Sequence, residues 1–276
     1  MKQSIRQLLA NQKSLLLPVA HDALTAKLIE LSGYSAYAIG GFGVAASSYA
    51  LPDNGSLVYE DLSPIFRRIL HSSNLPALVD ADTGYGDVTK AAQVVQAYES
   101  AGASAIFIED QVWPKRCGHA EGHKLVSIQE MQAKIKAAKN ALKNQDTILM
   151  ARTDSRSAEG SLEAAITRAK SYIEAGANSI FIEAPLSLEE VQQIPKELPN
   201  VILLINMMEW GKTPLVSQKQ LEQWGYQLIA YPITSILAQT KAIRDSLVYL
   251  QHHGTTTGYF EDHLTKFSDF RNIINL

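Results

Sequence analysis

The sequence contains very little cysteine, since Cys117 is the only one among 276 residues. A single cysteine excludes a disulfide bond within the chain and is typical of a reducing compartment. Long apolar runs are also missing, because no segment approaches the ~18–20 residues that a membrane-spanning helix needs. The first residues lack the charged start, the long apolar stretch and the cleavage site of a signal peptide. We therefore expect a cytoplasmic protein without a membrane partner.

Charge of one sign is not in excess either. The chain has 25 lysines and arginines against 28 aspartates and glutamates, which gives a net charge of −3, and no block of like charge stands out. This balance argues against nucleic acid as a partner. Apolar residues make up 46% and charged residues 19% of the chain, so a large buried core is available. We predict a single domain over residues 1–276.

Short runs of β-branched and other apolar residues recur along the chain, each followed by a longer segment with helical spacing. Their continuous apolar character is typical of parallel strands that are covered on both faces. Helical spacing is clearest in Lys90–Ala101, Ile128–Leu142 and Leu162–Ala175. Gly102 and Gly176 end two of these segments, in the position where helices favour glycine. The predicted strands are Leu15–Ala20, Ser35–Gly40, Ala77–Ala81, Ala105–Glu109, Thr147–Ala151, Ser179–Glu183, Ile202–Asn206 and Leu228–Tyr231.

Eight β-then-α units in about 250 residues predict an α/β protein with a (β/α)8 barrel of the TIM type. A doubly wound open sheet is the alternative. Residues 235–276 follow the last predicted strand, and we expect them to form an appendage of additional C-terminal helices. In a β/α barrel the active-site residues lie at the carboxyl ends of the strands. The polar residues at those ends are therefore the candidates for function.

Carboxylates follow several of the predicted strands. Asp80 and Asp82 are two residues apart, so they share one face if the third strand extends through both. Clustered carboxylates repel one another unless a cation lies among them, and hard oxygen ligands favour Mg2+ or Mn2+. Arg152 suits a substrate carboxylate. A single acidic residue after a strand is as often a helix N-cap as a functional group. For Asp110 and Asp154 both interpretations remain, a helix cap or a group that supports the site. The remaining polar residues at strand ends are Glu109, Glu183 and Asn206.

The loop after the fourth predicted strand contains the only cysteine. Lys115 and Arg116 precede Cys117 directly, and His119 follows it two residues later. Positive neighbours lower the pKa of a thiol and favour the thiolate. This pattern predicts an acid/base or nucleophilic role for Cys117. The alternative is a buried structural thiol.

These blocks together resemble the isocitrate lyase/phosphoenolpyruvate mutase superfamily. Lys115–His119 is similar to the catalytic loop of its lyases, whereas the phosphonate mutases have asparagine and serine in place of Cys117 and His119. The short chain is most similar to the branch of the 2-methylisocitrate lyases, the 2,3-dimethylmalate lyases and the plant petal death protein. The other matching blocks are Leu51–Asp53, Asp80–Gly86, Ile108–Gln111, Ala151–Asp154, Phe181–Ala184 and Gly211–Leu215.

The resemblance implies a (β/α)8 barrel, a homotetramer with exchanged C-terminal helices, and Mg2+ or Mn2+ as the cofactor. It implies that Asp82 holds the cation most directly, while Asp80, Glu109 and Asp53 act through water. A mobile loop with Cys117, Gly118 and His119 would close over a small-molecule carboxylate. The implied catalytic residues are Cys117, Arg152, His119 and Lys115. The implied substrate contacts are Gly40, Gly41, Phe42, Asp80, Gly118, Arg152, Glu183, Asn206, Pro232 and Thr234.

One position departs from the family pattern, because Gly40 stands where a serine is usual. The backbone N–H groups of Gly41 and Phe42 are then left to hold the oxo-acid carboxylate. The resemblance implies a carbon–carbon lyase that cleaves a 2-hydroxy di- or tricarboxylate, of the 2-methylisocitrate or 2-alkylmalate type. A 2-oxo acid such as pyruvate and a second carboxylate would be the products, with Cys117 as general acid/base. The alternatives are an oxaloacetate or phosphonopyruvate hydrolase in the same pocket, and a non-catalytic ligand-binding barrel.

Overall fold

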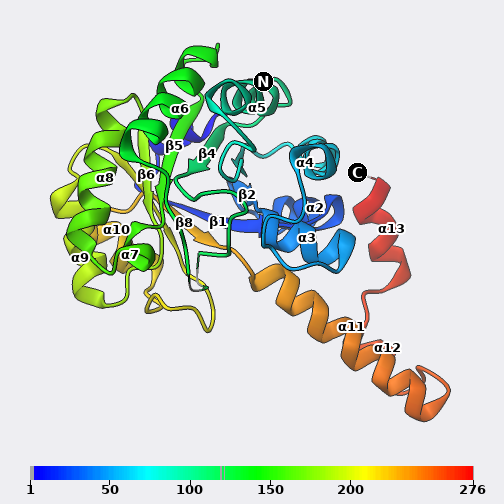
Figure 1. Ribbon diagram of the computed structural model, residues 1–276. Helices are drawn as coiled ribbons and strands as arrows, with labels where there is room; N and C mark the ends of the chain where they lie inside the picture. Colours follow the sequence, from blue (N-terminus) through cyan, green and yellow to red (C-terminus); the bar gives the residue numbers. More distant parts are fainter. Residues whose placement is uncertain (1–2, 119, 121, 276) are drawn as a thin grey trace.

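Eight parallel strands form a closed barrel in the computed structural model, which describes residues 3–118, 120 and 122–275. The strands follow one another in chain order, and helices surround them (Figure 1). β1 pairs with β2 and with β8, where Leu15 lies opposite Leu228, and this pairing closes the barrel. The predicted (β/α)8 fold is therefore confirmed. The strands are β1 Leu15–Ala20, β2 Tyr37–Ile39, β3 Ala77–Asp80, β4 Ala105–Glu109, β5 Ile148–Thr153, β6 Ser179–Ile182, β7 Ile202–Asn206 and β8 Leu228–Tyr231.

The strand ends differ from the predicted ones where chemistry is concentrated. β5 extends to Thr153, so Arg152 lies inside the strand and not after it. β3 ends at Asp80, and Asp82 lies beyond it with a φ of 46°. The condition for a shared strand face is therefore not met. A tight turn after β3, and not the pleat of the strand, sets how Asp80 and Asp82 lie relative to each other.

Several helices begin at a side chain that accepts a hydrogen bond from the first turn, as expected for N-caps. Asp87 accepts from the backbone N–H of Lys90 at 2.8 Å at the start of α5. Gly225 ends α10 with a φ of 112°, a conformation that favours glycine. The helices are α1 Ile5–Leu9, α2 Ala23–Leu31, α3 Gly41–Tyr49, α4 Tyr59–Ser72, α5 Val88–Ser100, α6 Ile128–Ala141, α7 Ser155–Ala158, α8 Leu162–Glu174, α9 Leu188–Glu197, α10 Gln218–Trp224, α11 Thr234–His253, α12 Phe260–His263 and α13 Phe267–Asn275.

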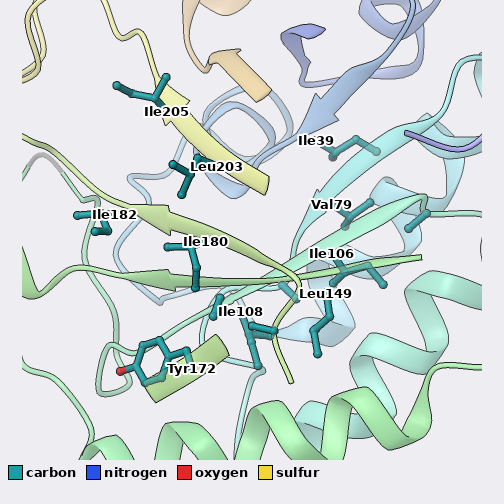
Figure 2. Close-up of a cluster of buried hydrophobic side chains, with 14 of the residues drawn as sticks. Ile39, Val79, Ile106, Ile108, Leu149, Tyr172, Ile180, Ile182, Leu203 and Ile205 are labelled. Atoms are coloured by element: carbon teal, nitrogen blue, oxygen red, sulfur yellow. The ribbon is translucent and has the colours of Figure 1, made fainter. Parts of the chain in front are cut away.

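Two apolar cores hold the strands, because successive residues of a strand point to opposite faces. Phe107 and Phe181 point into the barrel, where their ring centroids are 6.0 Å apart. Ile106 and Ile108 of the same β4 point outward into the cluster between sheet and helices (Figure 2). Fully burying one such side chain contributes roughly 1.5–3 kcal/mol. The two cores fix the strands and therefore the polar residues at their carboxyl ends.

Of the last helices, α11 projects away from the barrel and leads to α12, whereas α13 returns to contact α2 (Figure 1). α11 is 20 residues long, and none of them is buried. Leu247 on α11 and Phe267 on α13 are 60% and 77% exposed. Among the described residues, no helix combines the length and the apolar character needed to cross a bilayer. The division into one domain and a C-terminal appendage stays a prediction.

Candidate active site

A cavity opens at the carboxyl ends of the strands, the end at which β/α barrels carry their functional residues. Leu78 and Phe107, from the apolar layer inside the barrel, form part of its lining. Most of the predicted site residues also line it, so the fold brings together residues that are far apart in the sequence. These residues are Gly40, Gly41, Phe42, Asp53, Asp80, Lys115, Cys117, Gly118, Arg152, Glu183, Asn206 and Pro232.

Three carboxylates converge beside the first residue of α3. The backbone N–H of Asp82 donates to Asp80 Oδ1 at 2.9 Å, and that of Gly41 donates to Asp80 Oδ2 at 3.3 Å. A Cβ added at Gly41 would lie 3.5 Å from Asp53 Oδ1, 3.7 Å from Asp82 Oδ1 and 3.8 Å from Asp80 Oδ2. Carboxylate oxygens from the end of β3, the turn after it and the loop after α3 therefore surround one small space.

The packing of Asp80 and of Glu109 disfavours their charged forms. Burial, together with the charges of Asp82 and Asp53, raises the pKa of Asp80 to about 7. Burial also raises the pKa of Glu109, at the end of the neighbouring β4, well above its usual range. A bound proton or a bound cation relieves such repulsion. The cluster is thus suited to take up a cation near neutral pH.

Lys115 supplies one cation from the chain itself. Its Nζ lies 2.6 Å from Asp53 Oδ1 and 2.7 Å from Asp82 Oδ1, and the side chain is buried. Burial lowers the pKa of Lys115, but the charges of Asp82 and Asp53 outweigh it, and the pKa lies well above its usual range. Lys115 therefore stays charged, and its ammonium group pairs with the carboxylates although it is only two residues from Cys117.

Arg152 lies on the other side of the cavity among three carboxylates. Its Nε and Nη2 donate to the two oxygens of Asp154 at 3.0 and 2.8 Å. Glu183 Oε2 lies 3.2 Å from Nη1, and Glu109 Oε2 lies 3.4 Å from Nε. The two-pronged contact with Asp154 fixes the plane of the guanidinium group. Arg152 is thereby held ready for a substrate carboxylate.

Asp110 stabilises this arrangement through hydrogen bonds to Thr153 and Asp154, the two residues after Arg152. It accepts hydrogen bonds from the backbone N–H of Asp154 at 3.0 Å, from Thr153 Oγ1 at 2.7 Å and from Tyr172 Oη at 2.7 Å. Burial and the charge of Asp154 raise the pKa of Asp110 to about 6. The side chain of Asp154 makes no N-cap hydrogen bond to α7. Asp110 and Asp154 are therefore supporting groups and not helix caps.

The loop that carries Cys117 approaches the opposite wall closely. A Cβ added at Gly118 would lie 2.4 Å from Arg152 Nη2 and 2.5 Å from Glu183 Cγ, so only glycine fits there. Asn206 Nδ2 donates to Glu183 Oε2 at 3.1 Å and orients that carboxylate. Cys117 is half-buried and lines the cavity. The loop therefore covers the cavity and brings the thiol to its wall.

Comparison with known proteins places this site in a family. A family model described as phosphoenolpyruvate phosphomutase matches residues 5–250. This span includes the whole barrel and most of α11. The chain belongs to this family. The predicted resemblance to the isocitrate lyase/phosphoenolpyruvate mutase superfamily is confirmed.

Curated relatives cover almost the whole chain. The chain is 40% identical over 272 residues to 2,3-dimethylmalate lyase of Eubacterium barkeri, and the alignment covers 99% of this chain and 93% of that protein. It is also 40% identical over 261 residues to 2-methylisocitrate lyase of Halalkalibacterium halodurans (strain ATCC BAA-125 / DSM 18197 / FERM 7344 / JCM 9153 / C-125), covering 95% and 85%. Both relatives are therefore similar along the barrel and the site.

Solved structures of the family share the fold closely. Oxaloacetate acetylhydrolase in complex with the inhibitor 3,3-difluorooxalacetate superposes with a TM-score of 0.91 at 29% identity, over 99% of this chain and 92% of that one. A phosphonopyruvate hydrolase complex with oxalate and Mg++ superposes with a TM-score of 0.89 at 28% identity, over 99% and 94%. These two hydrolases thus share the architecture of this chain.

Among the described residues, three predicted site residues are absent from the lining of this cavity: Asp82, Glu109 and Thr234. Thr234 is exposed, and its hydroxyl donates to Glu209 Oε1 at 2.5 Å, so Ile233 borders the cavity in its place. His119 lies outside the described residues. Met208 and Ile233 line the cavity although the sequence analysis did not select them. Their position just after β7 and β8 was the available signal, but apolar residues carry no chemical signature.

The donor set fits a divalent cation that is held largely through water. Within residues 3–118, 120 and 122–275, no three His, Cys, Asp or Glu side chains are arranged to hold one ion directly. Glu109 Oε1 is buried and has no hydrogen-bond partner in the described part of the chain. A buried oxygen in that state is costly unless water or an ion completes it. Mg2+ typically binds one or two carboxylates and keeps several waters, and the cluster suits such an ion.

Proposed function

We propose that the protein is a Mg2+-dependent carbon–carbon lyase that cleaves a 2-hydroxy di- or tricarboxylate to a 2-oxo acid such as pyruvate and a second carboxylate. The observation that carries the proposal is the position of Cys117 on a loop that closes against Arg152 and Glu183, over a cluster of carboxylates. The names of the relatives, 2,3-dimethylmalate lyase and 2-methylisocitrate lyase, support the same reaction class.

In the proposed reaction the bond between carbons two and three of the substrate breaks. The 2-hydroxyl loses its proton to a base, its oxygen becomes the carbonyl of the 2-oxo acid, and the electron pair of the bond remains on carbon three. That carbon is stabilised by its neighbouring carboxylate. The thiol of Cys117 donates its proton to carbon three, and the base returns a proton to the thiolate. Pyruvate and propionate are the products if 2,3-dimethylmalate is the substrate.

The remaining groups bind and orient the substrate. Arg152, held by Asp154, pairs with a substrate carboxylate. Gly118 allows the loop to lie against the substrate pocket, which excludes water that would protonate the intermediate at random. Asp82, with Asp80, Glu109 and Asp53, would hold Mg2+ or Mn2+. A bound cation of this kind polarises the hydroxyl and carboxylate oxygens of the substrate.

A hydrolase in the same pocket is the second candidate. The similarity to solved structures of oxaloacetate acetylhydrolase and phosphonopyruvate hydrolase favours it, because they share the barrel over 99% of this chain. A substrate panel separates the two candidates. The purified protein with Mg2+ is given 2,3-dimethylmalate, 2-methylisocitrate, oxaloacetate or phosphonopyruvate, and the products are identified by NMR. The lyase proposal expects pyruvate from one of the first two substrates. Turnover of oxaloacetate or phosphonopyruvate alone would establish the hydrolase.

We also propose that the chain assembles as a homotetramer through its C-terminal helices. The support is that α11 has no buried residue and presents apolar side chains such as Ile243, Leu247 and Val248, each at least half exposed. Light scattering after size-exclusion chromatography should give four times the chain mass of 30.3 kDa. A Leu247→Asp variant should shift the mass to a smaller species. A monomeric wild-type protein would contradict the proposal.

A further inference from the structure

The loop that carries Cys117 is closed at its base by pairing between its two ends. The backbone of Gln111, just after β4, forms an antiparallel bridge with Leu125. The N–H of Val112 donates to the carbonyl of Lys124 at 2.7 Å. The two ends of the loop are therefore held against each other, and Gln111 has a fixed backbone from which its side chain can act.

The side chain of Gln111 binds the residue that precedes Cys117. Its Oε1 accepts from the backbone N–H of Arg116 and its Nε2 donates to the backbone carbonyl of Arg116, both at 2.9 Å. Gln111 is only 2% exposed, so water does not compete strongly for these two hydrogen bonds. The carbonyl of Arg116 and the N–H of Cys117 belong to one planar peptide group. Gln111 therefore fixes the peptide plane on the N-terminal side of Cys117.

The peptide group on the other side of Cys117 is held as well. His123 Nε2 donates to the carbonyl of Cys117 at 3.0 Å, and the N–H of Ala120 donates to the same oxygen at 2.8 Å. His123 is buried, and neither it nor Gln111 lines the cavity in the described part of the chain. With both flanking peptide groups held, the Cβ of Cys117 has a set position in the cavity wall, and the side-chain torsion alone moves the thiol.

We propose that Gln111 is a positioning residue for Cys117, and that it acts by holding both backbone groups of Arg116. The inference rests on the proposed function, in which Cys117 gives its proton to carbon three of the substrate. Proton transfer needs the thiol within reach of that carbon, and a displacement of about 1 Å lowers the rate by roughly a hundredfold. Because Gln111 does not line the cavity, its loss should spare the binding of substrate and cation.

The test compares the kinetics of Gln111→Met with those of a matched control, Gln132→Met. Methionine keeps the length and volume of the buried side chain and removes the amide. Gln132 Nε2 donates to the carbonyl of Ser171 at 3.0 Å, between α6 and α8, so the control loses a similar contact away from the cavity. With the substrate that the panel identifies, Gln111→Met should lower kcat about 100-fold and leave KM within about twofold. Gln132→Met should match the wild type.

A second readout is independent of turnover, because Cys117 is the only cysteine and its alkylation by iodoacetamide reports on one site. The thiol lines the cavity, so saturating pyruvate with Mg2+ should slow alkylation of the wild type and of Gln132→Met. In Gln111→Met this protection should be about fivefold smaller, because losing two hydrogen bonds of ordinary strength shifts the population of the held backbone by at least that factor. The Kd of pyruvate should stay unchanged.

The outcomes separate this inference from the proposed function. Unchanged kcat and protection in Gln111→Met would overturn the inference and leave the lyase proposal standing, and so would a loss in KM alone or an equal loss in Gln132→Met. If Gln111→Met does not fold, Gln111→Glu decides, since it keeps the acceptor for the Arg116 N–H and loses the donor, and wild-type behaviour there overturns the inference. A wild-type thiol that pyruvate does not protect would overturn it too. A substrate panel without lyase products, but with the expected difference in protection, strikes only the proposed function.

Discussion

The mouth of the barrel has two unlike halves. The half formed by β3 to β6 presents charged side chains, including Asp80, Arg152 and Glu183. The half formed by β7, β8 and the start of α3 presents Phe42, Met208 and Ile233, all apolar. The charged half contains the groups that the proposed bond cleavage needs. The apolar half contains none of them, and we propose that it contacts the apolar substituents of the substrate.

The comparison separates reaction type from substrate identity. Charged groups are matched to one another over short distances, as the 2.8 Å contact between Arg152 and Asp154 illustrates, so the chemistry tolerates little change. Apolar contacts scale with area and have no required direction. Changes in the charged half should therefore reduce turnover with every substrate, and changes in the apolar half should alter the preference among substrates.

The largest effect is expected at Cys117, on the loop over the charged half. Cys117→Ser replaces the proton donor with a hydroxyl that is a far weaker acid, and turnover should fall by roughly 10²–10⁴. Binding of pyruvate and Mg2+ should survive, because Arg152 and the carboxylates are untouched. Steady-state kinetics and a pyruvate titration measure the two quantities. Unchanged turnover would remove Cys117 from the mechanism.

Gly118→Ala should give the next largest effect. The added methyl would meet Arg152 and Glu183 at 2.4 and 2.5 Å, so the loop must move outward. A displacement of this size should lower kcat/KM about 100-fold for all substrates. Gly86→Ala is the matched control, because its methyl meets only the flexible side chain of Lys90. Equal activities of the two variants would show that the closed loop is not needed.

Much of this architecture is predictable from the sequence, for identifiable reasons. The eight strands are continuous apolar runs because both faces of each are buried, and the strand-end rule selects Asp80, Glu109, Arg152 and Glu183 without any contact information. The limits of that rule are local, because a turn such as the one at Asp82 depends on backbone angles that the apolar pattern does not encode.

Long-range partners were not predictable. Lys115 is a sequence neighbour of Cys117, yet its ammonium pairs with Asp53, 62 residues earlier in the chain. The supporting roles of Asp110 and Asp154 depend likewise on packing between β4, β5 and α8. The apolar residues Met208 and Ile233 carry no chemical signature. Sequence therefore identifies which groups reach the mouth, and only the fold shows which of them contact one another.

The raised pKa values in the charged half should make stability depend on pH. The pKa of Asp80 is raised to about 7 and that of Asp110 to about 6, above the ~3.9 of an unfolded aspartate. The folded state thus binds more protons between pH 4 and about 7, so stability falls as pH rises through that window. Melting of chelator-treated protein at pH 5 and 7.5 should show this fall.

Mg2+ sharpens the same prediction. The cation offsets the repulsion that grows as the acids ionise, so it should raise the melting temperature more at pH 7.5 than at pH 5. Asp80→Asn removes one titrating group and should flatten the pH dependence. An equal effect of Mg2+ at both pH values would contradict a cation site at these carboxylates.

The smallest effect is expected in the apolar half. Phe42 is 40% exposed and lines the cavity, so Phe42→Ala removes apolar area that an alkyl substituent of the substrate would cover. The ratio of kcat/KM for 2,3-dimethylmalate over unsubstituted malate should fall about fivefold, near 1 kcal/mol. Turnover at saturation should change little. An equal loss of kcat/KM for both substrates would show that Phe42 contributes to the reaction itself. It would contradict the division of the mouth into a charged half for chemistry and an apolar half for substrate preference.

The central claim is that Cys117 protonates the carbanion left by carbon–carbon cleavage. The most direct measurement is cleavage of 2,3-dimethylmalate in D2O with Mg2+, followed by NMR of both products. We expect pyruvate and propionate in equal amounts, with one deuteron of a single handedness on carbon two of propionate, because a fixed thiol delivers it from one face. A mixture of the two enantiomers of 2-deuteropropionate would contradict the account. So would the absence of pyruvate from a protein that turns over oxaloacetate or phosphonopyruvate.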